Sequence, residues 1–183
     1  KQGQPKAPWE PQPQALPSRP DLSLSVQPIQ ISTSAGPRFT TERNNGLARL
    51  DQARGFTIEL RAQAAPGAGK PGLVFEVYAA GSPRLVSRYR LTITPEAVYY
   101  DYDGASRTVA GKLDNAGGPH TFRLAVREDT AVQIYRDNVL LGVLPADVIT
   151  STTQAARGSY VEWGGAAGRV GRVTCDLSGP YAP

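Results

Sequence analysis

The chain has 183 residues, enough to bury one sizeable hydrophobic core, and its 20 Lys and Arg residues against 16 Asp and Glu residues give a net charge of +4. The basic residues are mostly arginine and are interspersed with acidic ones. This pattern argues against nucleic-acid binding, which needs a clustered basic stripe. Arginine prefers planar partners such as carboxylate, sulfate or phosphate, so the composition leaves an anionic ligand open.

The single cysteine, Cys175, excludes an intrachain disulfide, and the single histidine, His120, excludes a multi-histidine zinc site. Cys175 lies in an alternating apolar run, which predicts a buried thiol rather than a nucleophile. No run of 18 apolar residues is present, so no membrane span is expected. Because Lys1 is not a start methionine, we expect a mature fragment of a secreted or periplasmic protein.

Residues 1–28 contain seven prolines among Gln, Lys and Ser residues. Proline removes backbone donors and favours extended chain, so this region is predicted to be a linker or a strap on the surface of a domain spanning 29–183. Trp9 is expected to dock on that domain. The alternation over 22–34, broken once by Pro28, predicts either an edge strand or two short strands.

Alternating apolar and polar residues predict about ten or eleven strands, spaced as in an all-β sandwich. The stretch 120–144 contains two such runs, with a charged turn at 127–130 and a tighter turn at 137–138. It is predicted to be a hairpin half buried in a larger sheet. The other clear strands are 55–61, 73–78, 85–94, 97–103, 160–163 and 170–177. Residues 146–156 are expected to hold one helical turn.

The segments that follow one another across 29–183 are GFTIELR at 55–61, HTFRLAVR at 120–127, VQIYRDNVLLG at 132–142, YVEWGG at 160–165 and CDLSGPY at 175–181. This succession resembles a laminin-G-like domain of the concanavalin A-like lectin and glucanase superfamily. The resemblance implies a jelly-roll sandwich of two antiparallel sheets. It implies no single function, because the superfamily includes carbohydrate-binding modules, glycoside hydrolases, polysaccharide lyases and protein-binding modules.

No catalytic residue is predicted. The superfamily's glucanases carry E-x-D-x-x-E on one strand, which supplies paired carboxylates, and this chain lacks that motif. Glu59 and Glu76 on neighbouring strands would be the remaining pair, although solvated outward positions are the favoured reading. The lyase motif has only a poor match at 40–43. His120, alone of its kind, is expected to cap a strand or pack against a loop.

If Phe56, Leu73, Leu91, Val98, Phe122 and Ile134 face the core, the polar residues of opposite parity face outward. Tyrosine rings stack on sugar rings, and arginine, aspartate and glutamine side chains bond to hydroxyl groups. The predicted ligand-binding residues are therefore Tyr78, Arg90, Tyr99, Asp101, Arg123, Gln133 and Tyr135. The alternative is that cross-strand polar pairs merely complete a solvated sheet.

No cofactor is predicted, with calcium as the one exception that the superfamily resemblance allows. Its candidate oxygen ligands are Asp101, Asp103, Asp114 and Asp176, although a β-turn explains Asp103-Gly104 equally well. Trp163 suits either filling the core or stacking on a sugar.

The leading interpretation is a non-catalytic module that binds a polysaccharide or glycoconjugate and is joined by its Pro-rich segment to a larger protein or the cell surface. One alternative is a glycoside hydrolase or polysaccharide lyase using Glu59, Glu76 or Asp101. A second is a structural or protein-interaction domain.

Overall fold

The computed structural model describes residues 11–22, 24–25, 29–33, 36–40, 54–67, 72–81, 83–128, 130–164 and 167–183. Its strands are β1 (Leu24–Ser25), β2 (Ile29–Thr33), β3 (Gly36–Thr40), β4 (Phe56–Ala64), β5 (Leu73–Ala80), β6 (Leu85–Ile93), β7 (Ala97–Tyr102), β8 (Ala105–Gly111), β9 (His120–Val126), β10 (Ala131–Arg136), β11 (Val139–Pro145), β12 (Asp147–Thr150), β13 (Tyr160–Gly164) and β14 (Gly168–Asp176). One short helix, α1 (Thr152–Ala156), lies between β12 and β13. None of the described helices is long and apolar enough to cross a membrane.

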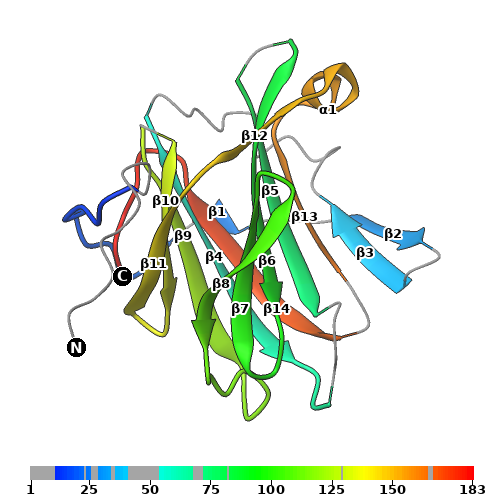
Figure 1. The fold of residues 1–183 in the computed structure, drawn as a ribbon, viewed down its shortest axis with the longest axis vertical. Coiled ribbons are helices and arrows are strands. Elements are labelled where there is room, and N and C mark those ends of the chain that lie inside the picture. Colours follow the sequence, from blue (N-terminus) through cyan, green and yellow to red (C-terminus); the bar gives the residue numbers. More distant parts are fainter. Residues whose placement is uncertain are drawn as a thin grey trace.

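The strands form two antiparallel sheets that pack face to face (Figure 1). One has six strands in the order β1-β14-β4-β9-β10-β11. The other has eight, in the order β2-β3-β13-β5-β6-β7-β8 with β12 added beside β6. The fold is a jelly-roll sandwich, which confirms the predicted class. The two short strands on either side of Pro28 join different sheets, β1 the first and β2 the second.

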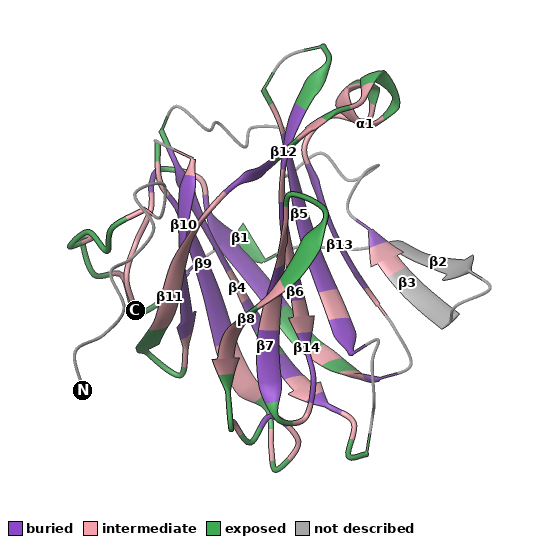
Figure 2. Ribbon diagram, in the orientation of Figure 1, coloured by how far each residue is buried: buried purple, intermediate pink, exposed green. Residues whose placement is uncertain are grey.

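The core lies between the sheets and is formed by every second residue of each long strand (Figure 2). The six residues expected to face the core are all at most 1% exposed: Phe56, Leu73, Leu91, Val98, Phe122 and Ile134. Trp163 belongs to this core, where its ring stacks between those of Phe39 and Phe75. Burying a large apolar side chain stabilises the fold by about 1.5–3 kcal/mol, so this alternation dictates which face of each strand turns inward.

The stretch 120–144 forms the consecutive antiparallel strands β9, β10 and β11. Asp137 and Asn138, between β10 and β11, have φ values of 47° and 69°. Two-residue hairpin turns of type I′ need positive φ at both positions, and Asp and Asn tolerate it better than most residues. Asp103 and Gly104, between β7 and β8, have the same conformation, with φ values of 52° and 71°. The turn predicted at 137–138 is confirmed, and at 103–104 the structure has the β-turn that was the alternative to a calcium loop.

The strands β3, β8 and β12 were not predicted from the sequence, and β11 is a third strand in the stretch 120–144, where two were expected. The strand β8 is an edge strand rich in Ala, Ser and Gly, and it is mostly exposed, so it lacks a clear apolar alternation (Figure 2). The strand β12 occupies part of the region where only a helical turn was expected. That turn is α1, and its N-cap Ser151 accepts a hydrogen bond from the Gln154 N–H at 3.1 Å. Trp9 and residues 41–43 lie outside the described residues.

Described segments near both ends of the chain lie against the outer face of the six-stranded sheet. Residues 11–22, here called the strap, run beside the C-terminal residues 177–183 (Figure 1). The Arg19 N–H donates to the Ala182 carbonyl at 2.8 Å, and the Ala182 N–H donates to the Pro17 carbonyl at 2.9 Å. The two segments therefore hold each other as well as the sheet.

Candidate functional site

The seven predicted ligand-binding residues lie on two different faces of the molecule. Tyr78 on β5, Arg90 on β6, and Tyr99 and Asp101 on β7 belong to the outer face of the eight-stranded sheet, because their sequence neighbours point into the core. Arg123 on β9, with Gln133 and Tyr135 on β10, belongs to the outer face of the six-stranded sheet. The structure thus places four of the seven residues on one face and the other three on the opposite face of the sandwich.

Arg123 is 1% exposed and holds both chain ends. Its Nε and Nη2 donate to a Glu59 carboxylate oxygen at 3.0 and 2.7 Å. Its Nη1 donates to the carbonyls of Arg19 and Ala182 at 2.6 and 2.7 Å, and Nη2 also donates to the Pro20 carbonyl at 2.9 Å. A guanidinium has five N–H donors, and all five are engaged here. Arg123 therefore has no donor left for a ligand.

Gln133 and Tyr135 also serve the strap. The Gln14 N–H donates to Gln133 Oε1 at 2.7 Å, and Gln133 Nε2 donates to the Tyr135 hydroxyl at 2.6 Å. The two side chains are 1% and 8% exposed. These two side chains form part of the surface against which the strap packs.

The candidate carboxylate pair of Glu59 and Glu76 is wrong. Glu59 lies on β4, between β14 and β9 in the six-stranded sheet, whereas Glu76 lies on β5, between β13 and β6 in the other. Both side chains point away from the core, so the whole sandwich separates them. Glycoside hydrolysis needs two carboxyl groups on either side of one bond, and this pair cannot supply them.

A row of charged side chains crosses the outer face of the eight-stranded sheet, and we call it the carboxylate–arginine row. Glu162 on β13 lies directly opposite Glu76 on β5, and Glu76 lies opposite Arg90 on β6. Arg90 Nε is 3.7 Å from Glu76 Oε1 and 3.3 Å from Asp101 Oδ2 on β7. The side chains of Glu76 and Glu162 are almost completely buried, whereas those of Arg90 and Asp101 are 34% and 22% exposed. The row therefore reaches solvent at its Arg90 and Asp101 end.

Neighbouring hydrogen-bond donors offset the cost of burying the two carboxylates at the inner end of the row. Two carboxylates directly opposite each other on adjacent strands repel, and burial adds a desolvation cost. Arg157 Nη2 donates to Glu162 Oε1 at 2.7 Å, and the Tyr78 hydroxyl donates to Glu76 Oε1 at 3.0 Å. Burial, and next the charge of Glu76, raise the pKa of Tyr78 well above its ordinary value, so its hydroxyl stays a donor.

Tyr78 has little surface to offer a ligand. Its side chain is 6% exposed, and its ring stacks on Tyr160 with centroids 4.5 Å apart. The guanidinium of Arg157 lies 4.1 Å from the centroid of the Tyr160 ring. Tyr78 therefore positions Glu76, while Arg90, Tyr99 and Asp101 make up the more accessible part of this face.

The three arginines described on this face differ in what their donors contact. Arg88 Nε donates to Asp147 Oδ2 at 2.9 Å, and Arg157 binds Glu162 and Gln154. Arg90 approaches its carboxylates through Nε, and its terminal Nη1 and Nη2 make no hydrogen bond with any described residue. The buried Nε of Arg90 makes charge contacts with Glu76 and Asp101 but no hydrogen bond, and its terminal nitrogens are N–H donors that no described residue accepts.

Glu162, Arg157 and Arg88 were not among the predicted site residues. The position of Glu162 between the apolar Val161 and Trp163 was the one available sequence indication of its outward direction. The pairing of Arg88 with Asp147 depends on β12, which the pattern did not reveal.

Three of the four aspartates considered as calcium ligands have other partners. Asp101 pairs with Arg90, and Asp176 pairs with Arg19 and accepts hydrogen bonds from Ser178. Asp114 Oδ1 accepts the N–H groups of Gly117 and Ala116, which lower its pKa. Within the described ranges, no group of three or more His, Cys, Asp or Glu side chains is arranged to hold a metal ion.

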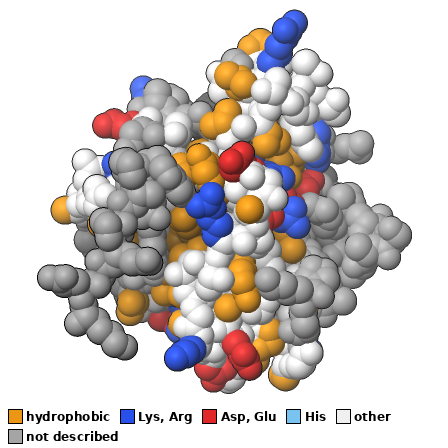
Figure 3. Space-filling view, in the orientation of Figure 1, with side chains coloured by type: hydrophobic (Ala, Val, Ile, Leu, Met, Phe, Trp, Pro, Cys, Tyr) orange, Lys and Arg blue, Asp and Glu red, His pale blue; other side chains and the backbone are white. Residues whose placement is uncertain are grey.

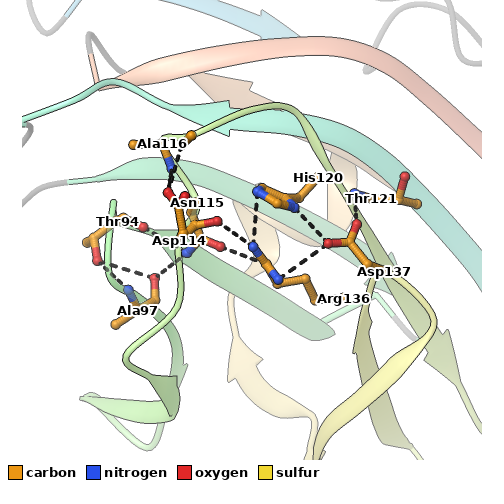
Figure 4. A network of polar contacts seen from close by, with 10 residues as sticks. Thr94, Ala97, Asp114, Asn115, Ala116, His120, Thr121, Arg136 and Asp137 are labelled. Carbon is orange, nitrogen blue, oxygen red and sulfur yellow. Dashed lines mark hydrogen bonds and ion pairs between the residues drawn. The ribbon is translucent and has the colours of Figure 1, made fainter.

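His120 lies in a separate polar network at the end of the sandwich (Figure 4). Its Nδ1 is 2.6 Å from Asp137 Oδ2, and Arg136 Nη2 lies 3.0 Å from its Nε2. Because the guanidinium can only donate, Nε2 accepts and the imidazole proton lies on Nδ1, facing Asp137. Arg136 Nε also donates to Asn115 Oδ1 at 2.9 Å. The network ties the β8–β9 loop to the β10–β11 turn, which is the loop-packing role expected of His120.

Charged side chains are dispersed over the face shown in Figure 3, where basic and acidic groups alternate among polar and apolar ones. No stripe of one sign crosses the described part of this face.

No protein-family model matches the sequence, and no curated protein matches it. Among solved structures, the chain is similar to the CBM40 module of a Ruminococcus gnavus IT-sialidase bound to α2,3-sialyllactose, with a TM-score of 0.52, 16% identity, and coverage of 84% of this chain and 94% of that one. It is also similar to a human galectin-16 variant, with a TM-score of 0.51, 8% identity, and coverage of 85% and 98%. These likenesses show the fold, a concanavalin A-like jelly roll that this chain shares with carbohydrate-binding modules and galectins.

Proposed function

We propose that this chain is a non-catalytic, laminin-G-like carbohydrate-binding module that recognises a polysaccharide or glycoconjugate on the outer face of the eight-stranded sheet. The observation that carries the proposal is the group formed by Arg90, Asp101 and Tyr99 on the adjacent strands β6 and β7. It combines a guanidinium group, a carboxylate and an aromatic ring within one face.

This combination matches the chemistry of a sugar. Hydroxyl groups accept hydrogen bonds from the Nη donors of Arg90 and donate to Asp101, and a ring face packs against the Tyr99 ring. The outer face of the other sheet is occupied by the strap and the C-terminal residues, as the hydrogen bonds of Arg123 and Gln133 show. The eight-stranded sheet is therefore the better candidate.

The solved structures add support at the level of fold. The Ruminococcus gnavus module is bound to a sialylated sugar, so the same architecture carries a glycan site in that protein. We also propose that the module is secreted or periplasmic, joined to a larger protein or the cell surface, and independent of calcium.

The absence of catalysis is part of the proposal. Glu76 and Glu162 are 3% and 5% exposed and already bound by Tyr78, Arg90 and Arg157, so neither carboxylate is presented to a glycosidic bond. An enzyme would require an accessible pair.

A glycan array that includes neutral, uronic and sulfated sugars tests the proposal, run with added calcium and with a chelator. We expect binding without product release, reduced by about tenfold or more in Arg90→Ala and Tyr99→Ala. Arg172→Ala, which removes an exposed arginine from the six-stranded sheet, is the matched control and should bind normally.

Other outcomes would point to the alternatives. New reducing ends or unsaturated uronates would identify a hydrolase or a lyase, and binding to no glycan would favour a protein-interaction domain. Unchanged affinity in both Arg90→Ala and Tyr99→Ala would remove the glycan site from this face.

A further inference from the structure

We infer that the part of the ligand in contact with Arg90 is an uncharged sugar diol, rather than a carboxylate or sulfate. This inference rests on the proposed glycan-binding function and narrows it to neutral glycans. The arginine-rich composition is also compatible with an anionic ligand, and the inference decides against that possibility.

The charges around Arg90 do not favour an anion. The carboxylate–arginine row contains the three carboxylates Glu162, Glu76 and Asp101 against the two guanidinium groups of Arg157 and Arg90. Arg90 lies between two of the carboxylates, so its positive charge is already compensated. An anionic ligand at its Nη atoms would gain little attraction and would lie close to the half-buried Asp101 carboxylate.

The guanidinium groups of Arg88 and Arg157 on this face are already paired. Arg88 is paired with Asp147, and Arg157 with Glu162. Binding an anion through either one would break an existing ion pair and leave its carboxylate without a partner. The charges of Arg88 and Arg157 are therefore already neutralised by carboxylates of the same chain.

The direction of the available hydrogen bonds also favours a hydroxyl group. The Nη groups of Arg90 only donate, and the carboxylate of Asp101 only accepts. A ligand that touches both must accept on one side and donate on the other. A hydroxyl group does both, and two adjacent hydroxyls match the two terminal nitrogens of the guanidinium group, whereas a carboxylate or sulfate has no hydrogen to donate to Asp101.

Charge contacts at the buried Nε also restrict the Arg90 side chain before any ligand arrives, without a hydrogen bond to that nitrogen. Glu76 Oε1 and Asp101 Oδ2 flank Nε at 3.7 and 3.3 Å, and the Tyr78 hydroxyl fixes Glu76. Orienting a long side chain in advance lowers the entropy cost of binding. A neutral ligand, which has no long-range attraction, benefits most from such preorganisation.

Matched pairs of ligands test the inference on the full chain: neutral polysaccharides, and the same polymers after oxidation of the C6 hydroxymethyl group to a carboxylate. We expect the neutral member of a bound pair to bind about tenfold or more tightly than its oxidised counterpart. Its affinity should change little between about 0.05 and 0.5 M salt, because no charge is paired on binding.

In Asp101→Asn, the ratio of affinities for the neutral and the oxidised polymer is measured. This ratio would not change if Asp101 only supported the fold. The amide oxygen still accepts a hydrogen bond, but the negative charge is gone, so the preference for the neutral polymer should shrink severalfold. Glu128→Gln removes an exposed charge from the β9–β10 turn and should leave the preference unchanged.

The outcomes separate this inference from the proposed function. Tighter binding of the oxidised polymers would overturn the neutral-ligand inference and leave glycan binding standing. A preference that is unchanged in Asp101→Asn would also overturn it. Failure to bind any glycan would overturn both.

Discussion

Replacing Arg123 tests how the two ends of the chain are held. The Arg123→Ala variant removes five hydrogen bonds: two to Glu59 and one each to the carbonyls of Arg19, Pro20 and Ala182. Because the guanidinium is 1% exposed, water does not replace these contacts without rearrangement of the strap. Removing one partner of a buried ion pair costs about 3–5 kcal/mol, a large part of the stability of an ordinary domain.

Chemical denaturation measures this loss as a fall in the free energy of unfolding, and hydrogen exchange locates it. We expect faster exchange at the Arg19 and Ala182 amides, which bond the two chain ends to each other. Arg123→Lys should recover part of the loss, because one ammonium can pair with Glu59 but cannot reach three carbonyls at once.

Arg172→Ala, at an exposed position of the same sheet, should change the unfolding free energy by no more than about 0.5 kcal/mol. If Arg123→Ala unfolds within about 0.5 kcal/mol of the unsubstituted chain and the exchange of both amides is unchanged, the role assigned to Arg123 is refuted.

Two further predictions concern other residues. Cys175 is fully buried, and burial followed by the charge of Asp176 raises the pKa of its thiol to about 12, so a thiol reagent at neutral pH should label it at the rate of unfolding. Rapid labelling of the native chain would contradict this. Burial acts to raise the pKa of Asp137, but the bonds from the Thr121 N–H and His120 lower it overall. A lowered pKa means that the ionised carboxylate stabilises the fold above the unfolded-state pKa and that this stabilisation disappears as the pH falls through the folded-state value. The stability difference between the unsubstituted chain and Asp137→Asn should therefore narrow below about pH 4, and a difference independent of pH would refute it.

Alternation of side chains predicted the fold class and the direction of most residues. Because β4 and β9 have hydrophobic residues at every second position, only one orientation of each strand buries them. The turn at 137–138 follows from the local conformational preference of Asp and Asn. These features depend on a few neighbouring residues. They were correct because no distant contact competes with them.

The choice between a binding residue and a structural one could not be made in the same way. Arg90 and Arg123 both occupy outward positions in alternating strands, so their local patterns are equivalent. They differ because residues 19, 20 and 182, far away in sequence, cover Arg123. The incorrect pairing of Glu59 with Glu76 has the same origin, since the pattern of a strand does not reveal which sheet it joins.

The most direct test of the proposed site is to map where a bound glycan acts. A neutral oligosaccharide that the array identifies would be titrated into the isotopically labelled chain while backbone amide chemical shifts are followed by NMR. We expect the largest changes on β6 and β7 around Arg90, Tyr99 and Asp101, and their loss in Arg90→Ala but not in Arg172→Ala. Changes centred instead on β9, β10 and the strap would contradict the account and place the ligand on the opposite face.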